Sequence, residues 1–148
     1  MLLTSLLLIP FAGSLALLLW PGSPPPQRFR LIAIAILMAQ LIASVVAALA
    51  FDPSQGGMQL QVLHRWLPGI ALDYSLGIDG LSLPLVLINA ALTLVSAVIT
   101  RDIDKRPRLY FAMLLLISGA VNGAFLAQNL LLFFLFYELE LIPLWLLI

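Results

Sequence analysis

The sequence has no cysteine, only one histidine and little charge, and each shortage excludes a class of function. Without cysteine the chain can form no disulfide and offers no thiolate to zinc or to an iron–sulfur cluster. Lys and Arg together number 7, as do Asp and Glu, so the formal net charge is +0 and no basic surface indicates binding to nucleic acid. Charged residues make up only 9% of the chain, too few to cover the surface of a soluble domain.

What the sequence has instead is long apolar runs. Hydrophobic residues make up 63% of its 148 residues, and the mean hydropathy is +1.13. Runs of about 18 or more apolar residues predict membrane-spanning helices. We therefore expect an all-α, multi-pass integral membrane protein in contact with lipid. The predicted spans are about 2–20, 31–51, 81–99, 109–127 and 130–148, with a polar-leaning connection at 52–80.

The two ends of the chain need separate interpretation. The opening "MLLTSLLLIPFAGSLALLLW" could be mistaken for a signal peptide, but it lacks the basic residues that begin one and its apolar run is too long. We expect a retained helix there. The last span is still running at Ile148 with no stop signal, which indicates a truncated chain.

The basic residues predict the orientation in the membrane. Six of the seven fall in the first and third loops, which share a side: Arg28, Arg30, Arg101, Lys105, Arg106 and Arg108. The opposite side has Arg65 with Asp52, Asp73 and Asp79. Because basic loops stay in the cytoplasm, the N-terminus is expected outside.

Small residues at four-residue spacing predict close helix packing. One stripe runs along the second span (Ala35, Ala39, Ala43, Ala47), and another along the fourth (Gly119, Gly123, Ala127). Such stripes let helix backbones approach each other in lipid, although membrane helices are also rich in Ala and Gly without that role.

The stretch "FFLFYELELIPLWLL" places two glutamates in an apolar run. With the last span starting near residue 130, Glu138 lies roughly 12 Å deep, close to the middle of the hydrocarbon core. An ionised acid there costs about 2.5–3.5 kcal/mol on insertion scales. Such acids usually face a bundle interior or water, pair with a base, or bind a proton. Two hypotheses stay open: a structural glutamate satisfied by another helix, and a proton or ion pathway.

Glu138 and Glu140 do not form a catalytic pair. Residues two apart on an α-helix differ by about 200° around its axis, so the two side chains point in nearly opposite directions. Pro143 releases the carbonyl of Leu139, which lies between them, and that carbonyl needs a partner. Together these features indicate a hydrated polar spot.

Other polar residues favour structural roles. Asp79, assisted by Ser82, is well placed to cap the third span. Ser118 and Asn122 are expected to join helices by hydrogen bonds. His64 lies beside Arg65 and Trp66 in a setting typical of a membrane interface, and we do not expect it to be a ligand.

Two segments, "LGIDGLSLPLVLINAAL" at 76–92 and "FYELELIPLWLLI" at 136–148, carry a resemblance. They resemble chain 4 of the respiratory and photosynthetic NAD(P)H–quinone oxidoreductases, an antiporter-like proton-translocating subunit of complex I. The matching positions are Tyr137, Glu138, Leu141, Ile142 and Pro143. The second acid, in "ELELIP", is similar to the cyanobacterial and plastid branch, whose acceptor is plastoquinone.

The resemblance implies a fold and a role for one residue. A full member has roughly fourteen helices with two inverted five-helix repeats, so residues 1–108 correspond to three N-terminal helices and residues 109–148 to the start of the first repeat. Glu138 falls on the family's proton-channel glutamate, whose lysine partner lies on a later helix that this chain does not reach. Glu140 is a secondary candidate.

The resemblance also implies the surroundings of the chain. Its partners would be other membrane subunits and lipid, in a cyanobacterial thylakoid or plasma membrane with the N-terminus lumenal or periplasmic. NAD(P)H or ferredoxin, iron–sulfur clusters and quinone would be bound elsewhere in the complex, with no cofactor or metal in this chain. Two alternatives remain: a cation/proton antiporter of the same fold without redox partners, and a membrane scaffold without a transport role.

Overall fold

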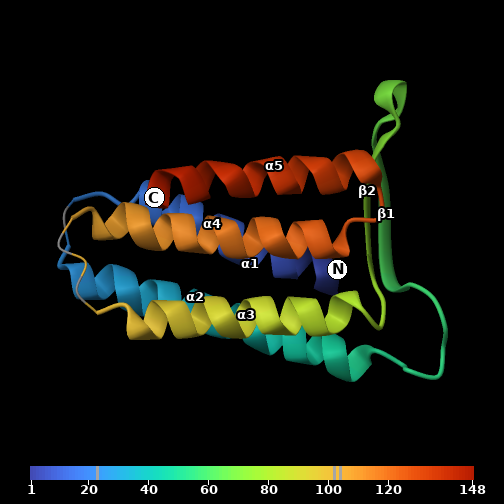
Figure 1. Ribbon diagram of the computed structural model, residues 1–148, viewed down its shortest axis with the longest axis horizontal. Coiled ribbons are helices and arrows are strands. Elements are labelled where there is room, and N and C mark those ends of the chain that lie inside the picture. Colours follow the sequence, from blue (N-terminus) through green and yellow to red (C-terminus); the bar gives the residue numbers. More distant parts are fainter. Residues whose placement is uncertain (23, 102, 104) are drawn as a thin grey trace.

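The computed structural model describes residues 1–22, 24–101, 103 and 105–148. Helices lie side by side along one direction, and a small two-stranded hairpin lies across one end of the bundle (Figure 1). The helices are α1 (Leu2–Leu18), α2 (Pro26–Ala50), α3 (Ser82–Ile99), α4 (Pro107–Leu126) and α5 (Leu130–Leu147).

Length and composition qualify four of these helices, α2 to α5, as candidate membrane spans. The remaining helix, α1, is equally apolar but has 17 residues and is therefore shorter. The helical membrane class predicted from composition is confirmed, and the helix bounds agree with the predicted spans except at the start of α2.

Helix α2 begins earlier than predicted, at Pro26 instead of near residue 31. Proline suits the first position of a helix because its missing N–H would have no partner there. Arg28 and Arg30, which we expected in the loop, therefore lie in the first two turns of α2. Long arginine side chains allow this because the guanidinium can reach past the end of the apolar segment.

The connection at 52–80, described from the sequence only as polar-leaning, contains the hairpin. Its strands are β1 (Gln59–Leu67) and β2 (Leu72–Ile78), and a short 3₁₀ helix, η1 (Pro68–Ile70), joins them. The strands are antiparallel, and Arg65 pairs with Asp73 in the register, which places opposite charges across from each other. No Asn-Gly or Asp-Gly dipeptide marks the turn, which is closed instead by Ala71 in the left-handed conformation (φ 53°). The hairpin was therefore missed.

Helix α4 is central to the bundle. It packs against α1, α5, α3 and α2, whereas α5 packs mainly on α4 and touches β2. Gly119 and Gly123 make two of these contacts close: a Cβ atom at Gly119 would lie 3.1 Å from Cγ of Pro10, and one at Gly123 would meet the ring of Phe136. The packing role predicted for these glycines is confirmed.

The alanine stripe predicted on α2 is only partly its packed face, since Ala43 and Ala47 pack in the core and the first two alanines do not. Ala35 and Ala39 are exposed. The buried side of this helix instead runs through Ala33, Leu37, Gln40, Ser44 and Ala47, each fully buried. Gln40 and Ser44 decide the rotation because their polar groups need partners that lipid cannot supply.

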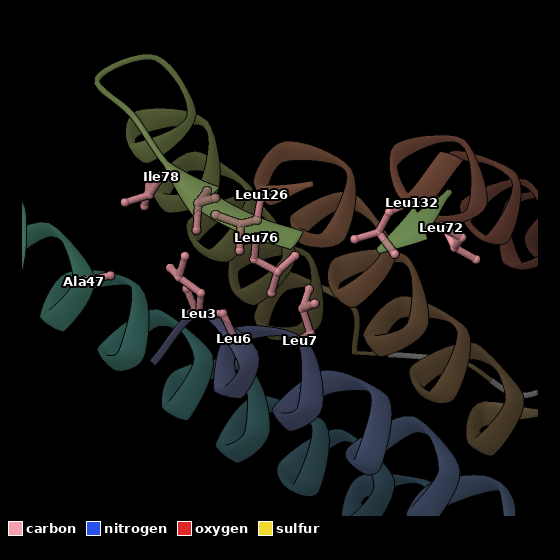
Figure 2. Close-up of a cluster of buried hydrophobic side chains, with 10 residues drawn as sticks. Leu3, Leu6, Leu7, Ala47, Leu72, Leu76, Ile78, Leu126 and Leu132 are labelled. Atoms are coloured by element: carbon pink, nitrogen blue, oxygen red, sulfur yellow. The ribbon is translucent and has the colours of Figure 1, made fainter. Parts of the chain in front are cut away.

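The apolar core has two parts, one toward each end of the bundle. At the hairpin end, Leu3 and Leu6 of α1 meet Leu76 of β2 and Leu126 of α4 (Figure 2). Toward the other end, Leu17 of α1 belongs to a second cluster with residues of α2, α3 and α4. Because Leu76 is fully buried, the hairpin is part of the core and not an appendage.

The end of the bundle away from the hairpin carries the connection from α1 to α2 and the connection from α3 to α4 (Figure 1). Most of the basic residues lie in these connections or in the first turns of α2 and α4, and we call the described residues of 19–31 and 98–108 the basic end. Two of its arginines bind backbone carbonyls near the ends of helices. Arg30 donates to the carbonyls of Ala97 and Val98 at the end of α3, and Arg108 donates to the carbonyl of Trp20 after α1. Cations are favoured there because helix C-termini carry partial negative charge.

Candidate functional site

The start of α5 is fixed by Asn129, and this sets where both glutamates lie. The Asn129 side-chain oxygen accepts hydrogen bonds from the amides of Leu131 (2.9 Å) and Leu132 (3.2 Å), which is the geometry of an N-cap. The side-chain nitrogen of Asn129 donates to the carbonyl of Ala71 in the hairpin, at 2.9 Å. The predicted short turn at 128–129 is confirmed, and it is attached to the hairpin.

Helix α5 packs on α4 with one face only. That face includes the buried Leu132 and Pro143 together with the half-buried Phe136 and Leu139. These positions recur at intervals of three to four residues, as one side of a helix requires. α5 runs through Pro143 as one helix, and the proline lies against the bundle.

Glu138 lies on the opposite face of α5. It is exposed, and it shares its side of the helix with Phe134 (53% exposed), Ile142 (56%) and Trp145 (78%). Glu140 is half-buried at the edge of the α4-facing side. The two acids thus have different surroundings, as their spacing predicted. The large apolar side chains around Glu138 form an exposed surface that is unfavourable in water, so we expect other protein or lipid to cover it.

The same geometry limits the chemistry available at α5. Two carboxylates on different sides of a helix cannot share a proton, and in the described ranges no group of three or more His, Cys, Asp or Glu residues could hold a metal ion. A single carboxyl group in an apolar region can bind and release one proton, which is the usual function of an intramembrane acid.

A second polar feature joins three helices inside the bundle. Gln40 of α2 and Ser118 of α4 exchange hydrogen bonds at 2.9 and 3.0 Å, and the Thr93 hydroxyl of α3 lies 3.2 Å from the Ser118 hydroxyl. Asn89 of α3 donates to the Ser118 carbonyl at 3.0 Å and to the side-chain oxygen of Asn122 at 2.8 Å. We call these five residues the polar cluster.

The cluster confirms the joining role predicted for Ser118 and Asn122. Their partners Gln40, Asn89 and Thr93 were missed, although the sequence carries a signal for them. Asn89 and Thr93 are four residues apart in an apolar span, as are Ser118 and Asn122, so each pair lies on one helix face. Polar pairs at this spacing on neighbouring spans are expected to meet.

The orientation of the Asn122 amide follows from its neighbours. The Ser118 carbonyl can only accept, so the Asn89 group facing it is the NH₂ group, and the atom of Asn122 that the same NH₂ group contacts is the oxygen. The Asn122 NH₂ group points elsewhere, and this buried nitrogen has no hydrogen-bond partner within the described residues. A buried unpaired donor costs about 1–3 kcal/mol.

The cap predicted for α3 is present. The Asp79 carboxylate accepts from the amides of Leu81 (3.0 Å) and Ser82 (2.6 Å), and the Ser82 hydroxyl accepts from the Asp79 amide at 2.9 Å. This reciprocal arrangement is a capping box that begins the turn leading into α3. His64, on β1, stacks on Tyr74 with ring centroids 6.5 Å apart.

The fold and its polar groups define a multi-pass helical membrane protein with one acid displayed on a helix face and a neutral polar cluster inside. No family model matches the chain. It is similar, however, to chain 4 of NAD(P)H-quinone oxidoreductases along almost its whole length.

Three relatives carry the comparison. The protein of Synechococcus sp. (strain RCC307) is 37% identical over 142 residues, 95% of this chain and 26% of that protein. The protein of Synechococcus sp. (strain JA-2-3B'a(2-13)), named chain 4 1, is 40% identical over 147 residues, 99% of this chain and 27% of its own length. That of Prochlorococcus marinus (strain MIT 9211) is 36% identical over 142 residues. The predicted resemblance is confirmed, and the chain spans about a quarter of these relatives.

Proposed function

We propose that the chain is part of a membrane subunit of a proton-translocating NAD(P)H–quinone oxidoreductase, with plastoquinone as the acceptor. The similarity to chain 4 proteins over 95–99% of the chain supports the assignment to such a complex. Other membrane subunits would be its partners. In this proposal NAD(P)H or ferredoxin, iron–sulfur clusters and quinone are bound by other subunits. The absence of cysteine agrees with this for the clusters.

We propose that Glu138 is the residue that binds and releases the proton. The observation that carries this proposal is its exposure on the face of α5 turned away from α4. A glutamate whose carboxylate already had hydrogen-bond partners inside the bundle would not need a further partner. Glu138 can instead face a basic group from the rest of a longer subunit, and making and breaking that pair would change its protonation.

Its surroundings explain how such a group can be coupled to a distant reaction. Charge is costly in the apolar layer, so the free energy of the ionised form depends strongly on whether a cation is near. A shift in the cation therefore moves the proton. In this proposal the chain supplies the acid, holds it at its depth in the apolar layer and surrounds it with apolar side chains. We place quinone reduction elsewhere in the complex.

The test is Glu138→Gln in the full-length subunit within its complex. We expect normal assembly on native gels, retained quinone reduction in uncoupled membranes, and proton pumping reduced at least about tenfold, because glutamine keeps the shape but binds no proton. Glu140→Gln is the matched control and should retain most pumping, since that acid lies on the other side of the helix.

Three outcomes would contradict the proposal. Full pumping in a correctly assembled Glu138→Gln complex would remove the residue from the proton path. Loss of assembly in both glutamine variants would instead assign the glutamates to helix association, as in a scaffold. Purification without any redox subunit would favour an antiporter of the same fold.

A further inference from the structure

The basic end of the bundle contains a polar pocket beside α2 and the end of α3. Its volume is about 360 Å³, and it is lined by Gln27, Arg30, Leu31 and Arg101. Among the residues that the structure describes, four line it, and two of these are the cations Arg30 and Arg101. These two guanidinium groups complement an anion.

Arg30 is held in place in a way that suits anion binding. Its Nε atom donates to the carbonyl of Ala97 at 3.3 Å, and its Nη2 atom donates to the carbonyl of Val98 at 2.5 Å. These two nitrogens form one edge of the planar guanidinium, so the Nη1–Nη2 edge keeps its donors. A fixed fork of this kind matches two oxygens of one phosphate group and loses little freedom on binding.

Arg101 supplies a second positive charge from the same region. It follows directly after the end of α3 (Ile99) and Thr100, and it is exposed. Because Arg30 binds the last carbonyls of that helix, its guanidinium lies close to the backbone that carries Arg101. The fold therefore fixes one arginine of the pocket and places the second beside it.

An apolar surface adjoins the pocket. Leu31 is 63% exposed, and on α3 Val98 and Ile99 are 43% and 70% exposed. In the spans of α2 and α3 only 28% and 22% of residues are buried inside the bundle. An anion-binding fork at the end of two apolar helices whose outer sides are exposed fits a ligand that has both a charged group and hydrocarbon chains.

We propose that this pocket binds the headgroup of an anionic phospholipid. The phosphate lies between Arg30 and Arg101, and an acyl chain lies along Leu31 and the exposed side of α3. Basic pockets between transmembrane helices recognise anionic headgroups through this combination of charge and depth. The proposal is independent of the proton-transfer role of Glu138, which lies on another helix.

The experiment uses the full-length subunit in its complex, reconstituted with phosphatidylglycerol that carries a photoactivatable group on an acyl chain. Crosslinked peptides are mapped by mass spectrometry, and phosphatidylcholine with the same acyl label is the headgroup control. We expect phosphatidylglycerol to label residues 27–31 and 95–101 several-fold more than phosphatidylcholine does. Excess unlabelled phosphatidylglycerol should compete, whereas inorganic phosphate should not.

Three variants test the residues. Arg101→Gln leaves the bonds of Arg30 to α3 intact and should lower this labelling about fivefold, in line with the loss of one basic residue near an anionic headgroup. Arg30→Lys keeps the charge but loses the fork and should also lower it. Arg28→Gln, an exposed cation outside the pocket, should leave it unchanged.

Three results would overturn the proposal. Equal labelling by both lipids would reduce the feature to a non-selective apolar surface. Competition by inorganic phosphate would make it a site for free anions. Absence of lipid labelling here, with these residues protected in the assembled complex, would show that a protein neighbour covers the pocket.

Discussion

At the scale of single residues, Asp79 shows how one side chain determines where a span begins. Its carboxylate binds two amides at the start of α3, and the hydrogen bond from the Ser82 amide is the main cause that lowers its pKa below the ordinary 3.8. The charged form is therefore favoured in the folded protein. Replacement by alanine leaves these amides without an acceptor and should destabilise the chain by about 1 kcal/mol.

The lowered pKa gives this cap a defined pH dependence. A carboxyl group with a depressed folded-state pKa contributes stability above its unfolded pKa and loses it as the pH falls through the folded value. We expect Asp79→Asn, which caps without charge, to be slightly less stable than the wild type near pH 7, and the difference in thermal unfolding to disappear as the pH falls through the lowered folded-state pKa. Because Asp79 remains partly exposed to solvent, screening limits the difference to less than about 1 kcal/mol. A pH-independent difference would contradict this account.

Also at this scale, Asn89 is the residue of the polar cluster that links α3 to two groups of α4. Asn89→Leu removes the donor to the Ser118 carbonyl and to the Asn122 oxygen, and it leaves the latter buried without a partner. Between membrane helices such bonds contribute about 0.6–2 kcal/mol each. We expect a loss of about 1–2 kcal/mol in unfolding of the detergent-solubilised protein.

Ser96→Ala is a suitable control on the same helix. The Ser96 hydroxyl is exposed and donates only to the Leu92 carbonyl one turn earlier, so its removal should change stability by less than about 0.5 kcal/mol. Equal losses in the two variants would mean that the cluster does not join helices.

At the scale of helices, the contact between α4 and α5 depends on the absence of a side chain at Gly123. A Cβ atom there would meet the ring of Phe136, which in turn stacks on Phe11 of α1 with ring centroids 6.3 Å apart. Gly123→Ala should therefore force the ring aside and cost about 1–3 kcal/mol, the usual range for overpacking. Thermal unfolding of the full-length subunit measures it.

A double variant separates steric conflict from other effects of the substitution. Phe136→Leu shortens the side chain over Gly123, so Gly123→Ala should cost clearly less in that background than in the wild type. Gly56→Ala is the matched control, because nothing lies within 4 Å of a Cβ atom there. If the cost of Gly123→Ala is unchanged by Phe136→Leu, the ring is not the obstacle.

At the scale of the whole molecule, the sequence predicts the helices well and their rotations poorly. Apolar length alone placed each span within a few residues of its observed bounds, because lipid demands a continuous hydrogen-bonded segment. The rotation of a helix about its own axis depends on which neighbouring helices are available. Ala35 and Ala39 were therefore predicted to pack against a neighbour, but they are exposed. Gln40 is the better indicator of the rotation of α2, because a buried side-chain amide must find a hydrogen-bond partner.

The hairpin and the candidate site show the other limit. Leu76 becomes buried only because α1 and α4 present leucines to it, a long-range condition that no local pattern reveals. The opposite placement of Glu138 and Glu140 did follow from helical geometry, because it needs nothing beyond the period of the helix. The role of Glu138 stays a prediction.

The attachment of α5 to the hairpin also fixes the depth at which Glu138 lies. The Gln128 amide binds the Ser75 carbonyl and Asn129 binds Ala71, so the first residue of α5 cannot slide relative to the hairpin. Glu138 then lies eight residues below that fixed point, roughly 12 Å along the helix axis. One residue inserted between Asn129 and Glu138 would lower the carboxyl group by about 1.5 Å and turn it by about 100°, into the position that Leu139 now has on the side facing α4. The depth of the acid is therefore set at the membrane surface, by a turn that contains no acid at all.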